Sequence, residues 1–284
     1  MSLKKSERMK IKNFVKIVKS QDKPIRFLVS RFLKYVGLSR FIKIHRKGYQ
    51  LHFHPSSLAL SLWVNPHDRN QDSAVLQSVL KKGDSFWDVG ANIGHLTLEA
   101  SLLVGNSGRV TAVEANPRVF RFLCENIELN KCRNVRLMCA ASGEHPGWMR
   151  FSDNRSDDQN SIDLEGSLEV PVVALDFFRE GSSVSLLKID VEGFELFVLR
   201  GAKNFLQNVE FVYFEAFRSH MEKFRYQFAD IHRLLSCHGF SIGIEENNKI
   251  RPIPSSNKAT LCQNYLAWRS DEDLLTRTGW SIEE

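Results

Sequence analysis

"DVGANIGHLTL", residues 88–98, carries the strongest signal of the fold in this chain. The apolar run "SFWDV" that leads into it suits a short buried strand. The run "HLTLEASLLV" that follows places Leu96, Ala100 and Leu103 on one face of a helix. A strand, a glycine turn and a helix form the geometry in which a helix N-terminus offers backbone N–H groups to a polar ligand. An ordinary strand-to-helix connection has the same pattern, so the loop alone leaves both interpretations open.

The same alternation continues along most of the chain. Strand-like segments are "SFWDVG", "GRVTAVEAN", "NVRLMCAA", "VSLLKID", "VEFVYFEAF", "FSIGIEE" and "QNYLAWR", and helical patterns separate most of them. Pro117 opens one of these helices, at the position where proline is tolerated. Strands that alternate with helices at this spacing predict an α/β fold: a doubly wound, mostly parallel, seven-stranded sheet with helices on both faces.

Local signals predict the structure of five further segments. "YQLHFH" and "LALSLWV" are expected to form a strand pair. "DSAVLQSVLKK" is expected to be a helix that Asp72 or Ser73 caps and Gly83 ends. "GFELFVLRGAKNFLQ" is expected to be one helix. Residues 143–173 break the rhythm, because the polar run "SDNRSDDQNS" separates strand-like "GWMRFS" from "LEVPVVA", and they predict an insertion or hairpin near the functional site.

Composition bounds the class of protein. The 284 residues are enough for one large α/β domain with an extension or for two small domains. The five cysteines show no metal-ligand spacing and are odd in number, which predicts buried free thiols in a reducing compartment. No apolar run approaches the ~20 residues of a membrane span, and no N-terminal apolar region precedes a small-residue cleavage site. We therefore expect a cytoplasmic protein.

Positive charge is concentrated at the N-terminus. Residues 1–48 hold ten Lys and five Arg against only Glu7 and Asp22, a net charge of +13 in a chain that carries +6 overall. Residues 1–48 are therefore predicted to be a basic, helical N-terminal extension, and residues 49–284 the main domain.

The apolar residues of this extension have helical spacing between the basic ones. They are Phe27, Leu28, Phe32, Leu33 and Val36. The pattern suits an amphipathic helix in peripheral contact with an anionic membrane. It also suits a helical cap on the main domain with solvated Lys and Arg side chains. No aromatic-rich binding motif accompanies the charge, which disfavours nucleic acid as a partner.

Four of the five predicted parallel strands end in a carboxylate. The four acids are Asp88, Glu114, Asp190 and Glu215. Ligands of doubly wound sheets bind outside the carboxyl ends of the strands, so these side chains are candidates for a site. Glu114 lies where an acid can accept hydrogen bonds from both ribose hydroxyls of an adenosine. A pyrophosphate would fit the loop poorly because Asn92 projects into it, whereas an amino-acid tail would fit better.

Four stretches resemble the FkbM-type methyltransferases, a branch of the class I fold that uses S-adenosylmethionine. They are "FWDVGANIGHLTL", "VTAVEANP", "ENIELN" and "LLKIDVEGFELFVLRGA", and "KIDVEGFE" is the most specific element. The resemblance covers roughly residues 50–270. Most members of that family are O-methyltransferases, so it implies S-adenosylmethionine as cofactor and a hydroxyl of a sugar, glycan or other small natural product as acceptor.

The resemblance also implies roles for particular residues. Asp88, Gly90, Asn92 and Gly94 would hold the methionine part of the cofactor, with Ala91 in the same loop, and Glu114 would hold the ribose. Asn116 and Ala141 would line the adenine. Asp190 and Glu192 would lie where the methyl donor and the acceptor meet.

A hydroxyl acceptor must lose a proton as it attacks the methyl group, and Asp190 at the end of the central strand is the best-placed base. Lys188 shares the strand face of Asp190 and could keep it ionised, or the two could form only a structural ion pair. Glu192 and Glu195 could equally cap the helix that follows. His220 is either a second base or a solvated loop histidine.

Three further alternatives stay open. Asp190 and Glu215 end adjacent strands and could begin a Mg²⁺ site, but "EAF" offers no third ligand, so no metal site is predicted. The chain could also be a cofactor-binding assembly partner without turnover, which would not need Asp190. An N-methyltransferase is a third interpretation, although "DVEG" is not the "NPPY"-like turn that usually grips an amine acceptor. Residues 143–170 are expected to select the acceptor.

Overall fold

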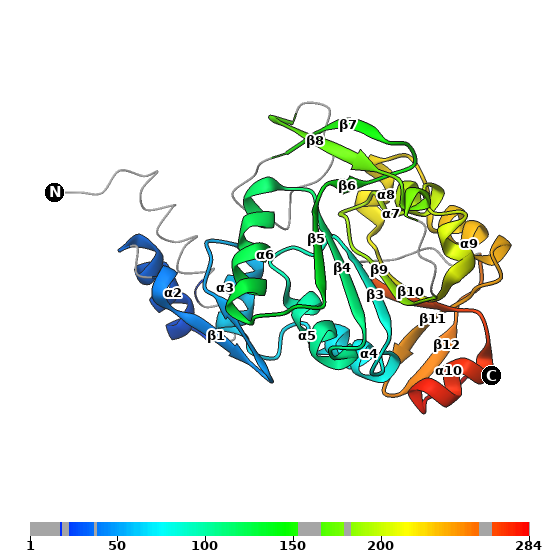
Figure 1. Ribbon diagram of the computed structural model, residues 1–284, viewed down its shortest axis with the longest axis horizontal. Helices are drawn as coiled ribbons and strands as arrows, with labels where there is room; N and C mark the ends of the chain where they lie inside the picture. Colours follow the sequence, from blue (N-terminus) through cyan, green and yellow to red (C-terminus); the bar gives the residue numbers. More distant parts are fainter. Residues whose placement is uncertain are drawn as a thin grey trace.

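The structure is a computed structural model that describes residues 18, 23–36, 39–152, 166–178, 183–255 and 263–283. Its centre is a nine-stranded sheet of order β14-β12-β11-β13-β10-β9-β3-β4-β5 (Figure 1). In chain order these are β3 (Ser85–Val89), β4 (Arg109–Glu114), β5 (Val135–Cys139), β9 (Val184–Ile189), β10 (Val209–Ala216), β11 (Ser241–Glu246), β12 (Lys249–Pro252), β13 (Gln263–Trp268) and β14 (Ser281–Ile282).

The pairing of these strands confirms the predicted doubly wound α/β sheet. The five strands from β10 to β5 are parallel, and β13 runs antiparallel between β10 and β11. The seven expected strands are all present. The sequence did not predict β12 and β14, which extend the sheet at one edge, or the helix α10 (Asp271–Thr278) between β13 and β14.

Helices cover both faces of the sheet. In Figure 1, α4 (Asn70–Val79), α5 (His95–Val104) and α6 (Pro117–Leu129) lie on one side, and α7 (Glu195–Arg200) and α9 (Phe228–Cys237) on the other. Phe86 of β3 packs in a cluster with α4 and α5, and its neighbour Trp87 packs in another with α7 and α9. Since successive side chains of a strand point to opposite faces, a strand covered on both sides is apolar without a break.

The predicted hairpin within residues 143–173 is present as a small second sheet. It contains β6 (Ala141–Ser142), β7 (Gly147–Phe151) and β8 (Leu168–Val173). Strands β7 and β8 are antiparallel, and β6 pairs with β8 in parallel. All but the first residue of the run "SDNRSDDQNS" lies outside the described residues.

The prediction of a strand for "LALSLWV" is wrong, because Ser57–Val64 form helix α3. The Ser56 side chain accepts a hydrogen bond from the Ala59 N–H at the helix start, and Ala59 and Leu62 are buried one turn apart. The strand β2 (Tyr49–His52) pairs instead with β1 (Lys43–Arg46). A short apolar run has no periodicity that separates a buried strand from a buried helix.

The predicted helix caps are also wrong. Helix α4 begins after Arg69, whose backbone is in the left-handed region with φ 63°. The helix ends at Val79, four residues before Gly83. Asp72 and Ser73 are buried inside the helix, where their side chains bond Tyr213 and Glu99. Tertiary partners therefore take the oxygens that capping would have used.

Three smaller expectations also need correction. The segment expected to be one helix after "DVEG" is interrupted, with α7 followed by the 3-10 helix η4 (Phe205–Asn208). His220 lies in helix α8 (Arg218–Lys223) and not in a loop. The four cysteines in the described part of the chain are free but not buried, and Cys237 at the end of α9 is exposed. Cys262 lies outside the described residues.

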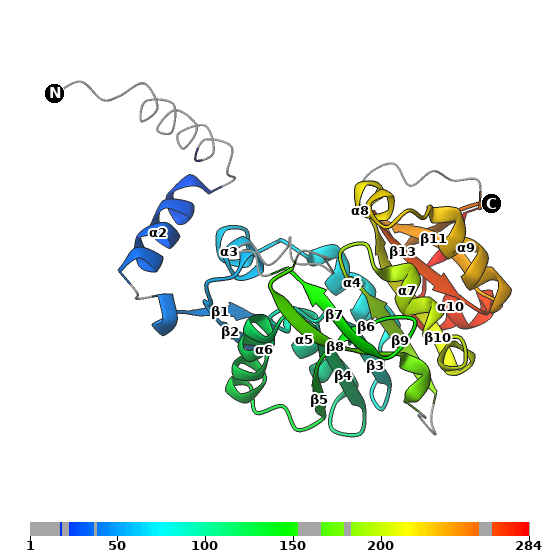
Figure 2. The same ribbon diagram turned by 90° about the horizontal axis from the view of Figure 1, so that it is seen from above.

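Helix α2 (Pro24–Tyr35) is at the periphery of the molecule, beyond β1 and β2 (Figure 2). Phe27 packs inward and is 4% exposed, whereas Ile25 and Phe32 are 78% and 62% exposed. The predicted boundary after residue 48 falls in the turn between β1 and β2, so the boundary stays a prediction. None of the helices in the described part of the chain is long and apolar enough to span a bilayer.

Asn126 of α6 ties together segments that are far apart in the sequence. Its side chain donates to the Ile93 carbonyl and accepts from the His52 N–H, both at 2.8 Å, and it is fully buried. Replacement by Leu keeps the volume and leaves both backbone groups without this partner. We expect Asn126→Leu to lower the free energy of unfolding by about 1–3 kcal/mol.

Urea denaturation checks this expectation, with Glu128→Leu as control because Glu128 is exposed on the same helix. A loss in Asn126→Leu no larger than in the control would show that the two hydrogen bonds contribute nothing to stability.

Candidate active site

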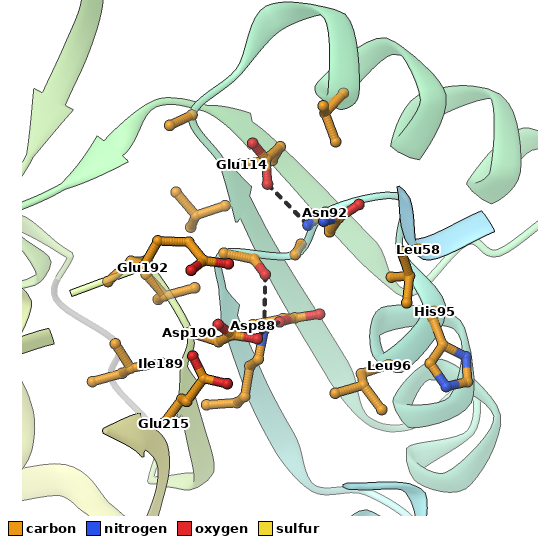
Figure 3. Close-up of a pocket in the computed structure, with 18 of the residues that line it drawn as sticks. Leu58, Asp88, Asn92, His95, Leu96, Glu114, Ile189, Asp190, Glu192 and Glu215 are labelled. Atoms are coloured by element: carbon orange, nitrogen blue, oxygen red, sulfur yellow. Dashed lines mark hydrogen bonds and ion pairs between the residues drawn. The ribbon is translucent and has the colours of Figure 1, made fainter. Parts of the chain in front are cut away.

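A cavity opens at the carboxyl ends of β3, β4, β9 and β10 (Figure 3). Ten of the eleven residues predicted for the site line it: Asp88, Gly90, Ala91, Asn92, Glu114, Asn116, Ala141, Lys188, Asp190 and Glu192. The structure thus brings together the residues that the sequence places at the ends of four strands. Gly94, the eleventh, lies behind the loop, where a Cβ would come 2.5 Å from Cδ1 of Leu123.

The loop after β3 follows a path that only a few residue types allow. Gly90 and Asn92 are both in the left-handed region, at φ 81° and 51°. A Cβ on Gly90 would lie 1.8 Å from the carbonyl oxygen of Asp190, so the loop contacts the end of β9 directly. The N–H groups of Gly90 and Ala91 donate to the Val113 carbonyl. These two N–H groups therefore shape the loop. The expectation that the N-terminus of the following helix, which begins at His95, offers N–H groups to a ligand stays a prediction.

Glu114 closes the other side of the loop. Its Oε2 accepts from the Asn92 N–H at 2.9 Å (Figure 3), and its Oε1 accepts from the Asn116 N–H at 2.8 Å. Burial raises the pKa of Glu114 to about 7, although both N–H groups oppose that change. A carboxylate offers about four lone-pair positions, so each oxygen can still accept a hydrogen bond from a ligand hydroxyl.

Lys188 is the buried cation of the site. Its ammonium lies 3.0 Å from Oδ1 of Asp88 and 3.7 Å from Oδ2 of Asp190, and donates to the Gly90 carbonyl at 2.7 Å. Burial alone would lower the pKa of Lys188, but the two carboxylates outweigh it and raise that pKa. Asp88 is fully buried and also accepts from the Thr97 hydroxyl at 2.6 Å. Lys188 therefore links the glycine loop, β3 and the end of β9.

The turn after β9 separates the roles of the two glutamates in "DVEGFE". Glu195 is buried, and its Oε1 accepts from the N–H groups of Val191 and Gly193 while Tyr226 donates to Oε2. Burial raises the pKa of Glu195 to about 7. Glu195 therefore holds the turn in shape, and Glu192 points toward the cavity (Figure 3).

Four further residues line the cavity that the sequence analysis did not assign to the site: Arg69, Asp72, Tyr213 and Asn264. Asp72 accepts from the Tyr213 hydroxyl at 2.7 Å and from Nδ2 of Asn264 at 2.8 Å. Arg69 lies 3.6 Å from the same carboxylate. All four line the cavity. They come from α4, its N-cap, β10 and β13, and no local pattern links segments so far apart.

The structure shows the local contacts of Asn116 and Ala141, the two residues predicted to line the adenine. Asn116 caps α6, because its side-chain oxygen accepts from the N–H groups of Arg118 and Val119. Ala141 begins β6 and is 5% exposed. Both border the cavity beside Glu114.

Residues 88–242 match the family model of the methyltransferase FkbM domain, which is more than half of the chain. The chain belongs to the FkbM methyltransferase family. It is 30% identical over 176 residues to the hexuronic acid methyltransferase AglP of Haloferax volcanii, covering 59% of this chain and 71% of that protein. It is also 30% identical over 119 residues to a probable cobalt-precorrin-6B C(15)-methyltransferase of Sulfolobus acidocaldarius, covering 42% of this chain and 60% of the relative.

Among solved structures, the methyltransferase FkbM of Methylobacillus flagellatus KT superposes with a TM-score of 0.44 at 14% identity. The match covers 74% of this chain and 54% of that one. A likeness at this level carries no argument about function.

As a member of the FkbM family, the chain is an S-adenosylmethionine-dependent methyltransferase. The cavity fits that cofactor chemically. Glu114 has lone pairs for two ribose hydroxyls, and the small side chains of Ala140 and Ala141 line the same cavity. The sulfonium and ammonium charges suit a cavity in which carboxyl groups outnumber cationic side chains among the described residues.

The pKa of Glu114 makes cofactor binding a test of its role. If Glu114 accepts the ribose hydroxyls as a carboxylate, protonation competes with binding. The affinity for S-adenosylhomocysteine should then fall as the pH drops below about 7, by up to about tenfold per pH unit. Glu114→Gln should bind about 1–3 kcal/mol more weakly at pH 8 and lose this pH dependence.

Calorimetric titration from pH 5.5 to 8.5 checks both effects, with Glu128→Gln on the exposed side of α6 as control. If Glu114→Gln retains the wild-type affinity at pH 8, the ribose assignment is wrong.

Proposed function

We propose that the protein transfers the methyl group of S-adenosylmethionine to a hydroxyl of a sugar or glycan, with Asp190 as the base. The observation that carries this proposal is the position of Asp190. Its carboxylate follows β9 directly, lines the cavity, is 28% exposed and lies 3.7 Å from the Lys188 ammonium. The neighbouring cation helps to fix the position of this carboxylate, and partial exposure leaves it accessible to an acceptor.

The cofactor would lie between the glycine loop and the acids that follow β3 and β4. Ala91, Asn92 and Gly90 would form the wall beside its methionine part, and Glu114 would hold its ribose, with Asn116 and Ala141 beside its adenine. Asp88 would act indirectly, because its carboxylate already bonds Lys188 and Thr97. Gly94 would act by letting the loop pack against α6.

The chemistry asks little of the protein beyond alignment and one proton transfer. S-adenosylmethionine supplies a methyl group already activated on a sulfonium. The cavity must hold the acceptor oxygen in line with that methyl group, and such alignment contributes several kcal/mol. Asp190 would take the hydroxyl proton on a carboxylate oxygen as the oxygen–methyl bond forms and the sulfur–methyl bond breaks, with the electron pair left on the sulfur of S-adenosylhomocysteine. Lys188 would hold the carboxylate of Asp190 in position for this transfer.

Two observations favour a sugar as the acceptor. The relative from Haloferax volcanii is a hexuronic acid methyltransferase. The cavity also has carboxylates beside Asp190, in Glu192 and Glu215, which can accept hydrogen bonds from several hydroxyl groups at once. Phe151 at the end of β7 lines the same cavity, which is consistent with a role for the β6–β8 sheet in selecting the acceptor. Nitrogen or carbon acceptors and a cofactor-binding protein without turnover are the competing functions.

We also propose that helix α2 contacts an anionic membrane surface. Ile25, Leu28, Val29 and Phe32 are each more than 40% exposed on a helix of twelve residues. The net charge of +13 in residues 1–48 complements anionic headgroups. A helix with exposed apolar side chains among basic ones lies in the interface between headgroups and acyl chains.

The role of Asp190 can be separated from cofactor binding. Asp190→Asn keeps the shape and removes the base, so we expect methyl transfer to slow by about a hundredfold to ten-thousandfold. Affinity for S-adenosylhomocysteine should change little, because the proposed cofactor contacts lie elsewhere. The assay follows labelled methyl from S-adenosylmethionine to a panel of hexuronic acids and neutral hexosides, and mass spectrometry locates the methyl group. Asp273→Asn, on the exposed first turn of α10, is the matched control.

If Asp190→Asn turns over at the wild-type rate, Asp190 is not the base and another group takes the proton. Joint loss of thermal stability and cofactor binding would instead assign Asp190 to a structural pair with Lys188. A product methylated on nitrogen or carbon would contradict the hydroxyl acceptor.

The membrane proposal predicts that the chain sediments with vesicles containing phosphatidylserine at low salt, and less with pure phosphatidylcholine. Each Lys or Arg near the surface contributes about 1 kcal/mol, and the binding should weaken with salt. Ile25→Asp with Phe32→Asp should release the protein. Leu275→Asp, which alters an exposed apolar residue of α10, should not. Absence of sedimentation by the wild type would leave α2 as a cap.

A further inference from the structure

Three side chains beside Asp190 converge on one point without having been predicted to do so. Glu192, Glu215 and His220 each offer one ligand atom, and these atoms all lie within 4.8 Å of one another. They come from the turn after β9, from β10 and from α8. Phe214 is the register partner of Ile189, so Glu215 and Asp190 follow at the same level on adjacent strands. Figure 3 shows Glu192, Asp190 and Glu215 directed toward the same space.

The imidazole of His220 lacks the hydrogen bond that would explain its position. Its Nδ1 is buried and has no hydrogen-bond partner, although it lies 3.3 Å from Oε2 of Glu192. The turn after β9 brings the two residues together, because a Cβ on Gly193 would lie only 2.7 Å from Cβ of His220. A buried nitrogen that makes no hydrogen bond is costly, and a metal ion bound to its lone pair would remove that cost.

The charge balance of the cavity points the same way. Among the described residues that line it, seven carry a carboxyl group, and only Arg69 and Lys188 carry a fixed positive charge. The ammonium of Lys188 serves Asp88 and Asp190, and the guanidinium of Arg69 lies against Asp72. Asp190 and Glu215 also act on the guanidinium of Arg69 and raise its pKa, against the lowering effect of burial. Two cations still face seven carboxyl groups among these residues, and a bound metal ion would add positive charge to the cavity.

The geometry points to a divalent metal ion site formed by Glu192, Glu215 and His220. Two carboxylates and one imidazole suit a borderline ion such as Mn²⁺ or Zn²⁺ better than Mg²⁺, which prefers oxygen ligands alone. Glu192 and His220 are 25% and 30% exposed, so water or an acceptor can complete the coordination. In the hydroxyl methylation proposed above, on which this role rests, the ion would bind two neighbouring oxygens of the acceptor next to Asp190.

Metal binding is tested on the full chain without acceptor or methyl donor, by calorimetry and by the loss of the free Mn²⁺ signal in electron paramagnetic resonance. One equivalent of Mn²⁺ should bind, Zn²⁺ should bind more tightly, and Mg²⁺ more weakly. Glu215→Gln and His220→Gln should each weaken Mn²⁺ binding by at least about tenfold. Glu222→Gln is the matched control, since Glu222 lies on α8 and pairs with the exposed Arg218.

His220→Asp is a second variant that keeps a ligand and changes its type. It should retain Mn²⁺ and lose most of the preference for Zn²⁺ over Mg²⁺. Thermal midpoints and S-adenosylhomocysteine affinities close to wild type show that each variant is folded.

The site is wrong if the wild type shows no saturable binding of Mn²⁺ or Zn²⁺. It is also wrong if folded Glu215→Gln and His220→Gln bind these ions as the wild type does, because binding would then lie elsewhere. These outcomes are independent of the proposed reaction. A chain that methylates hydroxyls equally well with a chelator and binds no ion would overturn the metal site alone, and one that binds the ion but methylates nitrogen would overturn the acceptor alone.

Discussion

The whole site depends on the interactions of one buried group, the ammonium of Lys188. It is buried in the sheet and joins the Asp88 carboxylate, the Gly90 carbonyl and the Asp190 carboxylate. A charge at this depth is tolerable only because opposite charges and a hydrogen bond surround it. The same three contacts set the position of the glycine loop relative to the end of β9. One side chain thus positions both the proposed cofactor-binding loop and the proposed base.

Two buried glutamates complete this arrangement from either side. Glu114 binds the N–H groups of Asn92 and Asn116, and Glu195 binds those of Val191 and Gly193. Burial raises the pKa of each to about 7, so both acids are held at a cost that their hydrogen bonds partly offset. Each shapes a turn at the carboxyl end of a strand. The cavity between those turns is consequently built before any ligand arrives, which reduces the ordering that binding would otherwise require.

Much of the fold and part of the site could be predicted from the sequence, for reasons visible in particular residues. Phe86 and Trp87 are buried on opposite faces of β3, and large apolar side chains at adjacent positions mark a strand that is covered on both faces. The glycines of "DVGANIG" and the acid of "VEAN" lie at strand ends, so their presence in one cavity follows from a parallel sheet. The errors came where local signals were ambiguous, as in α3, or where tertiary partners took a polar side chain, as with Asp72 and Ser73.

The sequence by itself determined the strand–helix alternation, the glycine loop and the positions of the acids at strand ends, because periodicity and turn chemistry are local properties of the chain. Only the tertiary structure decided which acid does what. In the structure, the Glu195 carboxylate binds backbone N–H groups, whereas Glu192 lines the cavity. The Asp88 carboxylate forms an ion pair with Lys188. The tertiary structure also brought His220 of α8 to Glu192 and Glu215, and Asn264 of β13 to Asp72. These pairings depend on how strands and helices distant in sequence pack against each other, which no local pattern of residues encodes.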